Sequence, residues 1–233
     1  MGRLRICILG DDLATTLGDA GGVGWTGHLT RSETSFGGRF ELMALGVAGE
    51  VTRDLASRAE AETAARLHDH AASLVLFCFG VADMSANEAE GVRLSLPESM
   101  FWAETVMRNS LRNYPTLWVG PPPLRPKSVW RDSEGRVWHL NGSRLMGLND
   151  AYKSLAEQLG VPYLDLMGTL NRDRRWQRAI EQGNGVHPLS EGHAALSNYI
   201  GRWSAWRKHL NPAAPGFLSE GLHAPTPKTA LIA

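Results

Sequence analysis

Five short, almost continuous apolar runs constrain the fold of this chain more than any other feature. They cover residues 4–10, 40–47, 73–80, 116–121 and 161–166. Longer stretches with helical periodicity separate them. A strand without polar alternation is expected where both of its faces are covered, as in a parallel sheet between two layers of helices. The pattern therefore predicts an α/β fold, a single-domain three-layer α/β/α sandwich with a five-stranded parallel sheet.

The intervening segments predict helices and one polar excursion. Helices are expected over residues 52–68, 98–113, 143–159 and 189–207. Residues 124–142 are polar and contain a Glu-Gly turn signal, so we expect a hairpin there, with Trp130 and Trp138 on its arms. The domain is expected to cover residues 1–210, and the Pro-rich residues 211–233 are expected to form a C-terminal tail.

Charge and hydropathy argue against two classes of partner. The 24 basic and 24 acidic residues cancel, whereas a non-specific nucleic-acid binder usually carries a basic excess. No apolar run is long enough to span a bilayer, so no membrane partner is expected. The first residues lack the apolar region and cleavage site of a signal peptide, and we therefore expect a cytoplasmic location.

The two cysteines predict no special chemistry. Cys7 and Cys78 each lie inside an apolar run, which favours small buried core residues. No Cys or His spacing is typical of a metal site, so neither a metal nor another cofactor is expected. Among the eight tryptophans, Trp118 lies in a predicted strand and is expected to pack in the core.

The most informative local stretch is CILGDDLATTLGD, in which the first apolar run ends in a glycine and two acids, Asp11 and Asp12. The carboxyl ends of parallel strands meet at one edge of the sheet, where ligands bind. Segments 46–50, 80–83 and 120–123 follow other predicted strands, so they should share this edge with Asp12.

Four blocks in this order resemble the SGNH, or GDSL-type, hydrolases, a superfamily of esterases, lipases, thioesterases and carbohydrate deacetylases. The blocks are GDDL (10–13) with its continuation GDAGGVGWTGHL (18–29), GVAGEVT (46–52), FGVAD (79–83) and NGVHPLSEGH (184–193). The resemblance spans about residues 4 to 206. It implies a flavodoxin-like fold and a small ester or acyl-bearing substrate.

The resemblance also implies where the catalytic groups lie, and three of them differ from the family pattern. The family's serine nucleophile falls on Asp12, its oxyanion-hole asparagine on Ala82 and its triad aspartate on Asn184. The oxyanion glycine is retained as Gly49 and the catalytic histidine as His187. The site of a serine hydrolase is thus present in outline without its nucleophile.

These replacements argue against the usual serine mechanism. Asp12 has no hydroxyl, and attack of its carboxylate on an ester would give an anhydride. Ala82 lacks a hydrogen-bond donor, and the loss of one oxyanion donor costs about 10²–10³ in rate. Asn184 carries no charge, and an equivalent Asp→Asn change in a serine protease costs about 10⁴.

Several functions remain open, of which a divergent hydrolase is the leading one. Asp12 and His187 are expected within hydrogen-bond reach, where the pair would activate water as a general base. Asp12 could instead attack an sp³ carbon. The chain is also compatible with an inactive relative that binds a ligand or partner in the inherited cleft, or with a non-hydrolytic biosynthetic enzyme that uses Asp12 as a base. The sequence indicates no oligomeric state.

Other residues near the blocks have both a functional and a structural interpretation. Asp11 and Asp83 are candidate substrate-binding residues, but Asp11 is also suited to bind turn amides and Asp83 to cap the loop after its strand. Glu50 precedes the next predicted helix, and an acidic side chain is favourable near the N-terminus of a helix. His193 is expected to pack within the fold. One cleft is expected to be lined by Gly10–Asp12, Gly49, Ala82 and His187, with Trp130 or Trp138 in its wall.

Overall fold

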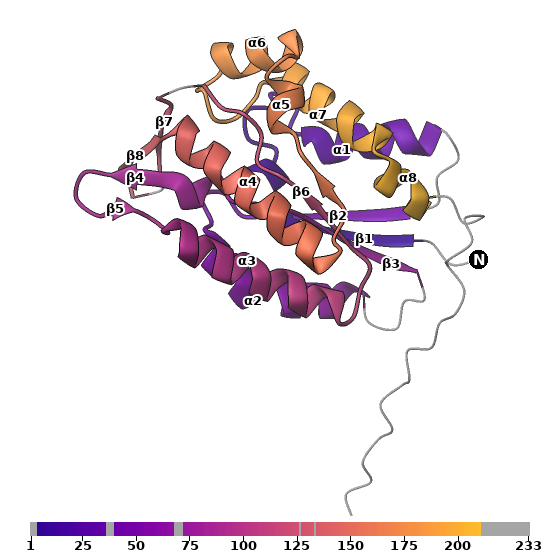
Figure 1. Cartoon of the computed structure of the whole chain (residues 1–233). Helices are drawn as coiled ribbons and strands as arrows, with labels where there is room; N and C mark the ends of the chain where they lie inside the picture. Colours follow the sequence, from indigo (N-terminus) through magenta and orange to yellow (C-terminus); the bar gives the residue numbers. More distant parts are fainter. Residues whose placement is uncertain (1–3, 36–39, 68–71, 126, 133, 211–233) are drawn as a thin grey trace, which may run out of the picture.

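A five-stranded parallel sheet forms the centre of the protein in a computed structural model, which describes residues 4–35, 40–67, 72–125, 127–132 and 134–210 (Figure 1). The strand order is β2-β1-β3-β6-β9. The strands are β1 (Leu4–Gly10), β2 (Phe40–Gly46), β3 (Ser73–Cys78), β6 (Thr116–Val119) and β9 (Tyr163–Leu164). Each coincides with a predicted apolar run, although β9 is only two residues long.

Helices cover both faces of this sheet, as predicted. They are α1 (Gly24–Ser35), α2 (Thr52–Leu67), α3 (Leu96–Leu111), α4 (Gly142–Leu159), α5 (Met167–Leu170), α6 (Arg174–Gln182), α7 (Ser190–Arg202) and α8 (Ser204–Leu210). Figure 1 shows α2, α3 and α4 on one face and α1, α6, α7 and α8 on the other. Within the described ranges, no helix is both long and apolar enough to cross a membrane.

Strand β1, which lies between β2 and β3, shows why its sequence is almost wholly apolar. Cys7 and Leu9 point into the core cluster shared with α2, α3 and α4. Ile6 and Ile8 point into the opposite cluster, which is shared with α1, α6 and α7. All four side chains are inaccessible to solvent. A strand that is buried on both faces has no position for a polar side chain.

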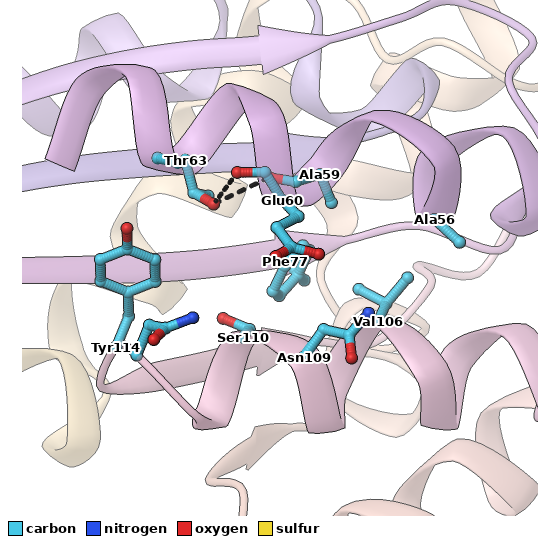
Figure 2. A pocket seen from close by; sticks show the side chains of 11 residues that line it. Ala56, Ala59, Glu60, Thr63, Phe77, Val106, Asn109, Ser110 and Tyr114 are labelled. Carbon is cyan, nitrogen blue, oxygen red and sulfur yellow. Dashed lines mark hydrogen bonds between the residues drawn. The ribbon is translucent and has the colours of Figure 1, made fainter. Parts of the chain in front are cut away.

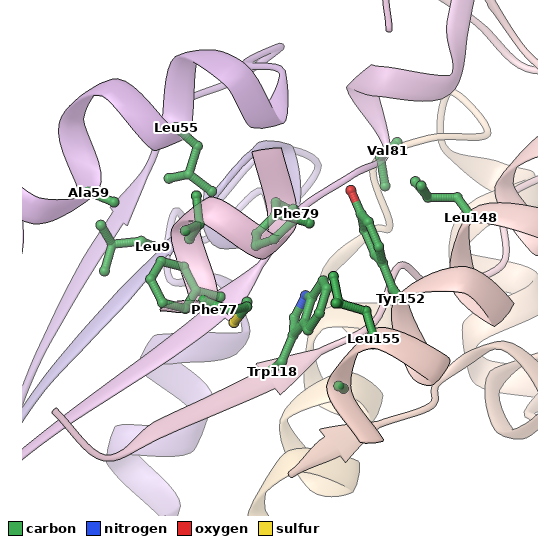
Figure 3. Close-up of a cluster of buried hydrophobic side chains, with 14 of the residues drawn as sticks. Leu9, Leu55, Ala59, Phe77, Phe79, Val81, Trp118, Leu148, Tyr152 and Leu155 are labelled. Carbon is green, nitrogen blue, oxygen red and sulfur yellow. The ribbon is translucent and has the colours of Figure 1, made fainter. Parts of the chain in front are cut away.

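Aromatic side chains fill the core beneath α4 (Figure 3). The Trp118 ring stacks on Phe79 at a centroid distance of 5.2 Å and tilts against Tyr152 at 4.6 Å. The predicted core position of Trp118 is therefore confirmed. Cys7 and Cys78 are likewise buried free thiols, as expected.

A second, antiparallel sheet stands beside the main one, in the order β5-β4-β8-β7. Its strands are β4 (Ser85–Asn87), β5 (Gly91–Val92), β7 (Val129–Arg131) and β8 (Val137–Leu140). The predicted hairpin is confirmed, since β7 and β8 pair with Trp130 opposite Trp138. The sequence did not predict β4 and β5, because each is too short to show a pattern.

The prediction of one helix over residues 189–207 is wrong. Trp203 has extended backbone angles (φ −65°, ψ 126°) and separates α7 from α8. The break redirects the chain so that Trp206 is completely buried. Helix α1 was not predicted, because its Gly and Thr residues obscure the apolar periodicity. Helix α6 was not predicted either, although its buried residues Trp176, Ala179 and Ile180 have helical spacing, since it is only nine residues long. The predicted tail, 211–233, lies outside the described residues.

Buried polar contacts join α1 and α7. The Asp19 carboxylate accepts hydrogen bonds from Ser190 Oγ (2.5 Å) and the Gly24 amide (2.8 Å). Burial raises the pKa of Asp19, but these and other hydrogen bonds outweigh burial and lower it to about 2. His193 accepts from the Trp25 amide through Nδ1, and Nε2 lies 2.9 Å from the Leu17 carbonyl. His193 therefore has the structural role that we expected.

Gly10 provides a test of how closely the strands meet at the candidate site. A Cβ at this position would lie 1.7 Å from the carbonyl oxygen of Cys78, which is backbone and cannot move aside. We expect Gly10→Ala to lower the free energy of unfolding by about 3 kcal/mol or more, measured by urea denaturation with tryptophan fluorescence.

The matched control is Gly147→Ala, on the exposed face of α4, where an added Cβ meets no atom within 4 Å. This change should raise stability by about 0.5–1 kcal/mol, since glycine is unfavourable inside a helix. Equal effects of the two substitutions would contradict the close approach of β1 and β3.

Candidate active site

Asp11 joins the ends of the neighbouring strands β1 and β3. Its carboxylate is 1% exposed and accepts hydrogen bonds from the amides of Leu13 (3.1 Å), Gly80 (2.8 Å) and Val81 (2.9 Å). Burial and the neighbouring charge of Asp12 raise the pKa of Asp11 to about 8, although the amides favour its charged form. The expected hydrogen bond between Asp11 and the turn is confirmed. The same carboxylate also binds two amides of the loop after β3.

Asp12 is the next residue, and its carboxylate points toward two other loops. Oδ1 lies 2.8 Å from His187 Nε2, and Oδ2 accepts the backbone N–H of Gly49 at 2.8 Å. The side chains of Asp12 and His187 are only 9% and 14% exposed. The expected proximity of Asp12 and His187 is confirmed, while their catalytic role stays a prediction. Three segments that are distant in sequence thus meet at one carboxylate.

Asn184 holds the loop that presents His187. Its Oδ1 accepts the backbone N–H groups of Val186 (3.0 Å) and His187 (2.8 Å), and its Nδ2 lies 2.9 Å from His187 Nδ1. Gly185, which lies between Asn184 and Val186, has a left-handed φ of +83°. Its carbonyl accepts a hydrogen bond from Ser128 Oγ. Hydrogen bonds to Asn184 and Gly185 therefore fix the loop that leads into His187.

Gly49 lies in the loop between β2 and α2 and requires glycine for two reasons. Its φ is +71°, and an added Cβ would lie 2.8 Å from the Trp130 ring. Its carbonyl accepts Arg93 Nη1 at 2.6 Å, and Arg93 lies over the Trp138 ring. Trp130 therefore lies against Gly49, while its expected place in the wall of a cleft stays a prediction. Trp138 is buried.

Glu50 and Arg58 stabilise the base of this loop. Arg58 donates two hydrogen bonds to the Glu50 carboxylate, at 2.7 and 2.6 Å. The same guanidinium donates to the carbonyls of Leu45 (3.0 Å) and Gly10 (3.3 Å) at the ends of β2 and β1. Glu50 thus precedes α2, as expected, and it also orients a cation that holds two strand ends together.

Asp83 and Ala82 lie in the short 3₁₀ helix after β3, and both are buried. The Asp83 carboxylate accepts the amide (2.7 Å) and hydroxyl (2.6 Å) of Thr52, so it caps the start of α2 rather than its own loop. Burial raises the pKa of Asp83, although the hydrogen bonds from Thr52 act to lower it. Ala82 packs with Val51 and Leu94. This geometry favours structural roles for both residues over contact with a substrate.

Two recesses lie away from Asp12. A recess of about 70 Å³ opens between α2 and α3, where Figure 2 shows Thr63 and Ser110 on its two sides. A second, of about 340 Å³, lies beside α1 and α7 and is lined by Arg202 among others. Neither is lined by His187. In the described part of the chain, no group of His, Cys, Asp and Glu side chains could hold a metal ion.

The arrangement supplies a carboxylate and an imidazole but no hydroxyl nucleophile in contact with His187 among the described residues. The nearby Thr15 hydroxyl donates to the carbonyl of Asp12 (2.7 Å) and accepts the Leu17 amide, so it belongs to the turn. Gly49, which the family resemblance assigns to the oxyanion hole, has its N–H bound to the Asp12 carboxylate. The carboxylate and the imidazole in contact are groups of the kind that act as general acids and bases.

Structural relatives share this fold at low sequence identity. A lipase/acylhydrolase from Enterococcus faecalis is 16% identical, with a TM-score of 0.62 over 88% of this chain and 96% of that one. A catalytic mutant of the acetylxylan esterase Axe2 from Geobacillus stearothermophilus is 15% identical, with a TM-score of 0.66 over 87% and 94%. The aryl esterase of M. smegmatis is 20% identical, with a TM-score of 0.59 over 84% and 98%.

No curated protein matches the chain in sequence. The model of the GDSL-like Lipase/Acylhydrolase family matches residues 8–195, which include the four blocks. This match spans most of the domain and includes both Asp12 and His187. The chain therefore belongs to the GDSL-like lipase/acylhydrolase family.

Proposed function

We propose that this protein hydrolyses a small acyl ester with a water molecule that the Asp12–His187 pair activates. The observation that carries the proposal is the 2.8 Å contact between Asp12 Oδ1 and His187 Nε2 at the carboxyl edge of the sheet. A positioned acid–base pair contributes about 10²–10⁴ in rate when it exchanges a proton with the reacting group. Family membership supplies the reaction class.

The proposed reaction balances without a covalent intermediate. The pair takes one proton from water as the water oxygen attacks the ester carbonyl. The tetrahedral intermediate then collapses, the bond from carbon to the alcohol oxygen breaks, and the pair returns the proton to that oxygen. Direct attack by Asp12 on the carbonyl is less favourable, because it would leave a mixed anhydride in place of an ester.

The surroundings of the pair support a small substrate with an apolar part. Trp130 presents an aromatic ring beside Gly49, and the two catalytic side chains are mostly shielded from solvent. The esterases of similar fold are named for acetylated xylan and for aryl esters. An ester of a ring-bearing alcohol is common to both names, and we assign the same substrate class here.

One observation favours a second function, a non-catalytic protein that binds a ligand. The N–H of Gly49 is already bound to Asp12 Oδ2, so a developing oxyanion must compete with a resident carboxylate for this donor. In that case Asp12 and His187 form an ion pair or hydrogen bond that shapes the site. Enzyme assays separate the two functions.

The first assay compares wild type with Asp12→Asn and His187→Ala on p-nitrophenyl acetate and on acetylated sugars. We expect each substitution to lower kcat/KM by about 100-fold or more, because either removes the proton acceptor or its partner. The control is Asp54→Asn, an exposed acid in the first turn of α2, which should retain wild-type activity. Equal rates for wild type and Asp12→Asn on every substrate would favour the binding protein.

The second assay restores the family's residues. The variant with the triple change Asp12→Ser, Ala82→Asn and Asn184→Asp should have an esterase activity about 10-fold or more above that of Asp12→Ser alone. The reason is that the members of a catalytic triad act as a unit. Ala82 is tightly packed, so the double change Asp12→Ser and Asn184→Asp accompanies the triple one as a less disruptive variant. If both folded variants are inactive on a panel of acyl esters, the site does not retain the geometry for serine catalysis.

A further inference from the structure

The orientation of the Asn184 amide is set by backbone groups and not by the imidazole. Two N–H donors, from Val186 and His187, point at the same side-chain atom of Asn184. That atom must be the acceptor oxygen, since the amide nitrogen has only donors. The reversed orientation would place N–H against N–H twice and leave both backbone donors without an acceptor.

With the oxygen engaged, Asn184 presents its N–H to the His187 ring. Nδ2 and Nδ1 are 2.9 Å apart, so Nδ1 must accept and cannot carry a proton. The single proton of the neutral ring then lies on Nε2, which faces the Asp12 carboxylate at 2.8 Å. We infer that Asn184 is a positioning residue that fixes the Nε2–H tautomer of His187, so that the imidazole donates to Asp12 and Asp12 is the proton acceptor of the pair.

The histidine therefore points its proton the opposite way from the histidine of a serine triad. There, an aspartate accepts Nδ1–H, and the free lone pair of Nε2 takes the proton from the nucleophile. Here Nε2 is occupied by a proton, so His187 cannot act as the base without a change of tautomer. Only the catalytic step rests on the proposed function. In that step the water proton goes to the Asp12 carboxylate, and His187 Nε2–H and the Gly49 amide hold this carboxylate in place.

Nitrogen NMR of the ¹⁵N-labelled full chain tests the tautomer without any substrate. Long-range ¹H–¹⁵N correlation spectra recorded above neutral pH distinguish protonated from unprotonated ring nitrogens, and the signals that vanish in His187→Gln identify the ring. We expect Nε2 protonated and Nδ1 unprotonated in wild type. Asn184→Asp should protonate Nδ1, because a carboxylate oxygen then replaces the amide N–H opposite it.

Two further variants keep the test specific. Asn198→Asp adds the same charge at an exposed position of α7 and should leave the His187 signals unchanged. Asn184→Ala removes the donor without adding an acceptor and should shift the two ring nitrogens toward averaged positions. A protonated Nδ1 in wild type, or His187 signals that are the same in wild type, Asn184→Asp and Asn184→Ala, would overturn the inference.

The outcome is separable from that of the proposed function. If the tautomer is as inferred and wild type hydrolyses no ester, the role of Asn184 stands and the hydrolase proposal fails. If wild type hydrolyses esters but carries its proton on Nδ1, the hydrolase proposal stands and the assignment of Asp12 as the acceptor fails.

Discussion

The hydrogen bonds of Asp11 determine where the rest of the site can lie. This buried carboxylate joins the turn after β1 to the loop after β3 through three backbone amides. The next residue, Asp12, points toward the loops of Gly49 and His187. Gly10 permits the arrangement, since any side chain there would overlap the carbonyl of Cys78. The need of buried backbone groups for partners thus brings three distant segments together.

The replaced residues of the site are consistent with one another. A carboxylate at position 12 needs donors, and it receives them from the Gly49 amide and from the ring of His187. An aspartate at 184 would place a second carboxylate on the same imidazole, whereas Asn184 offers an N–H and leaves one charge at the site. Asp12 and Asn184 are therefore suited to each other, as serine and aspartate are in the usual triad.

Burial and hydrogen bonding explain which features could be predicted from the sequence. The strands were predictable because burial on both faces leaves continuous apolar runs, and the approach of Asp12 to His187 followed from the family resemblance. Helix α1 was missed because its glycines and threonines carry little periodicity, and its contact with α7 depends on Asp19 and His193, which only the fold brings together. The orientation of Asn184 depends on two backbone amides, whose directions no residue pattern reveals.

The most direct test of this account is a double-mutant cycle on the contact between Asp12 and His187. The free energy of unfolding is measured by urea denaturation for wild type, Asp12→Ala, His187→Ala and the double variant. A hydrogen bond to a mostly shielded carboxylate predicts a coupling energy of about 1 kcal/mol or more, with the double variant less destabilised than the sum of the single ones. Strictly additive effects would show that the two side chains do not interact and would contradict the account.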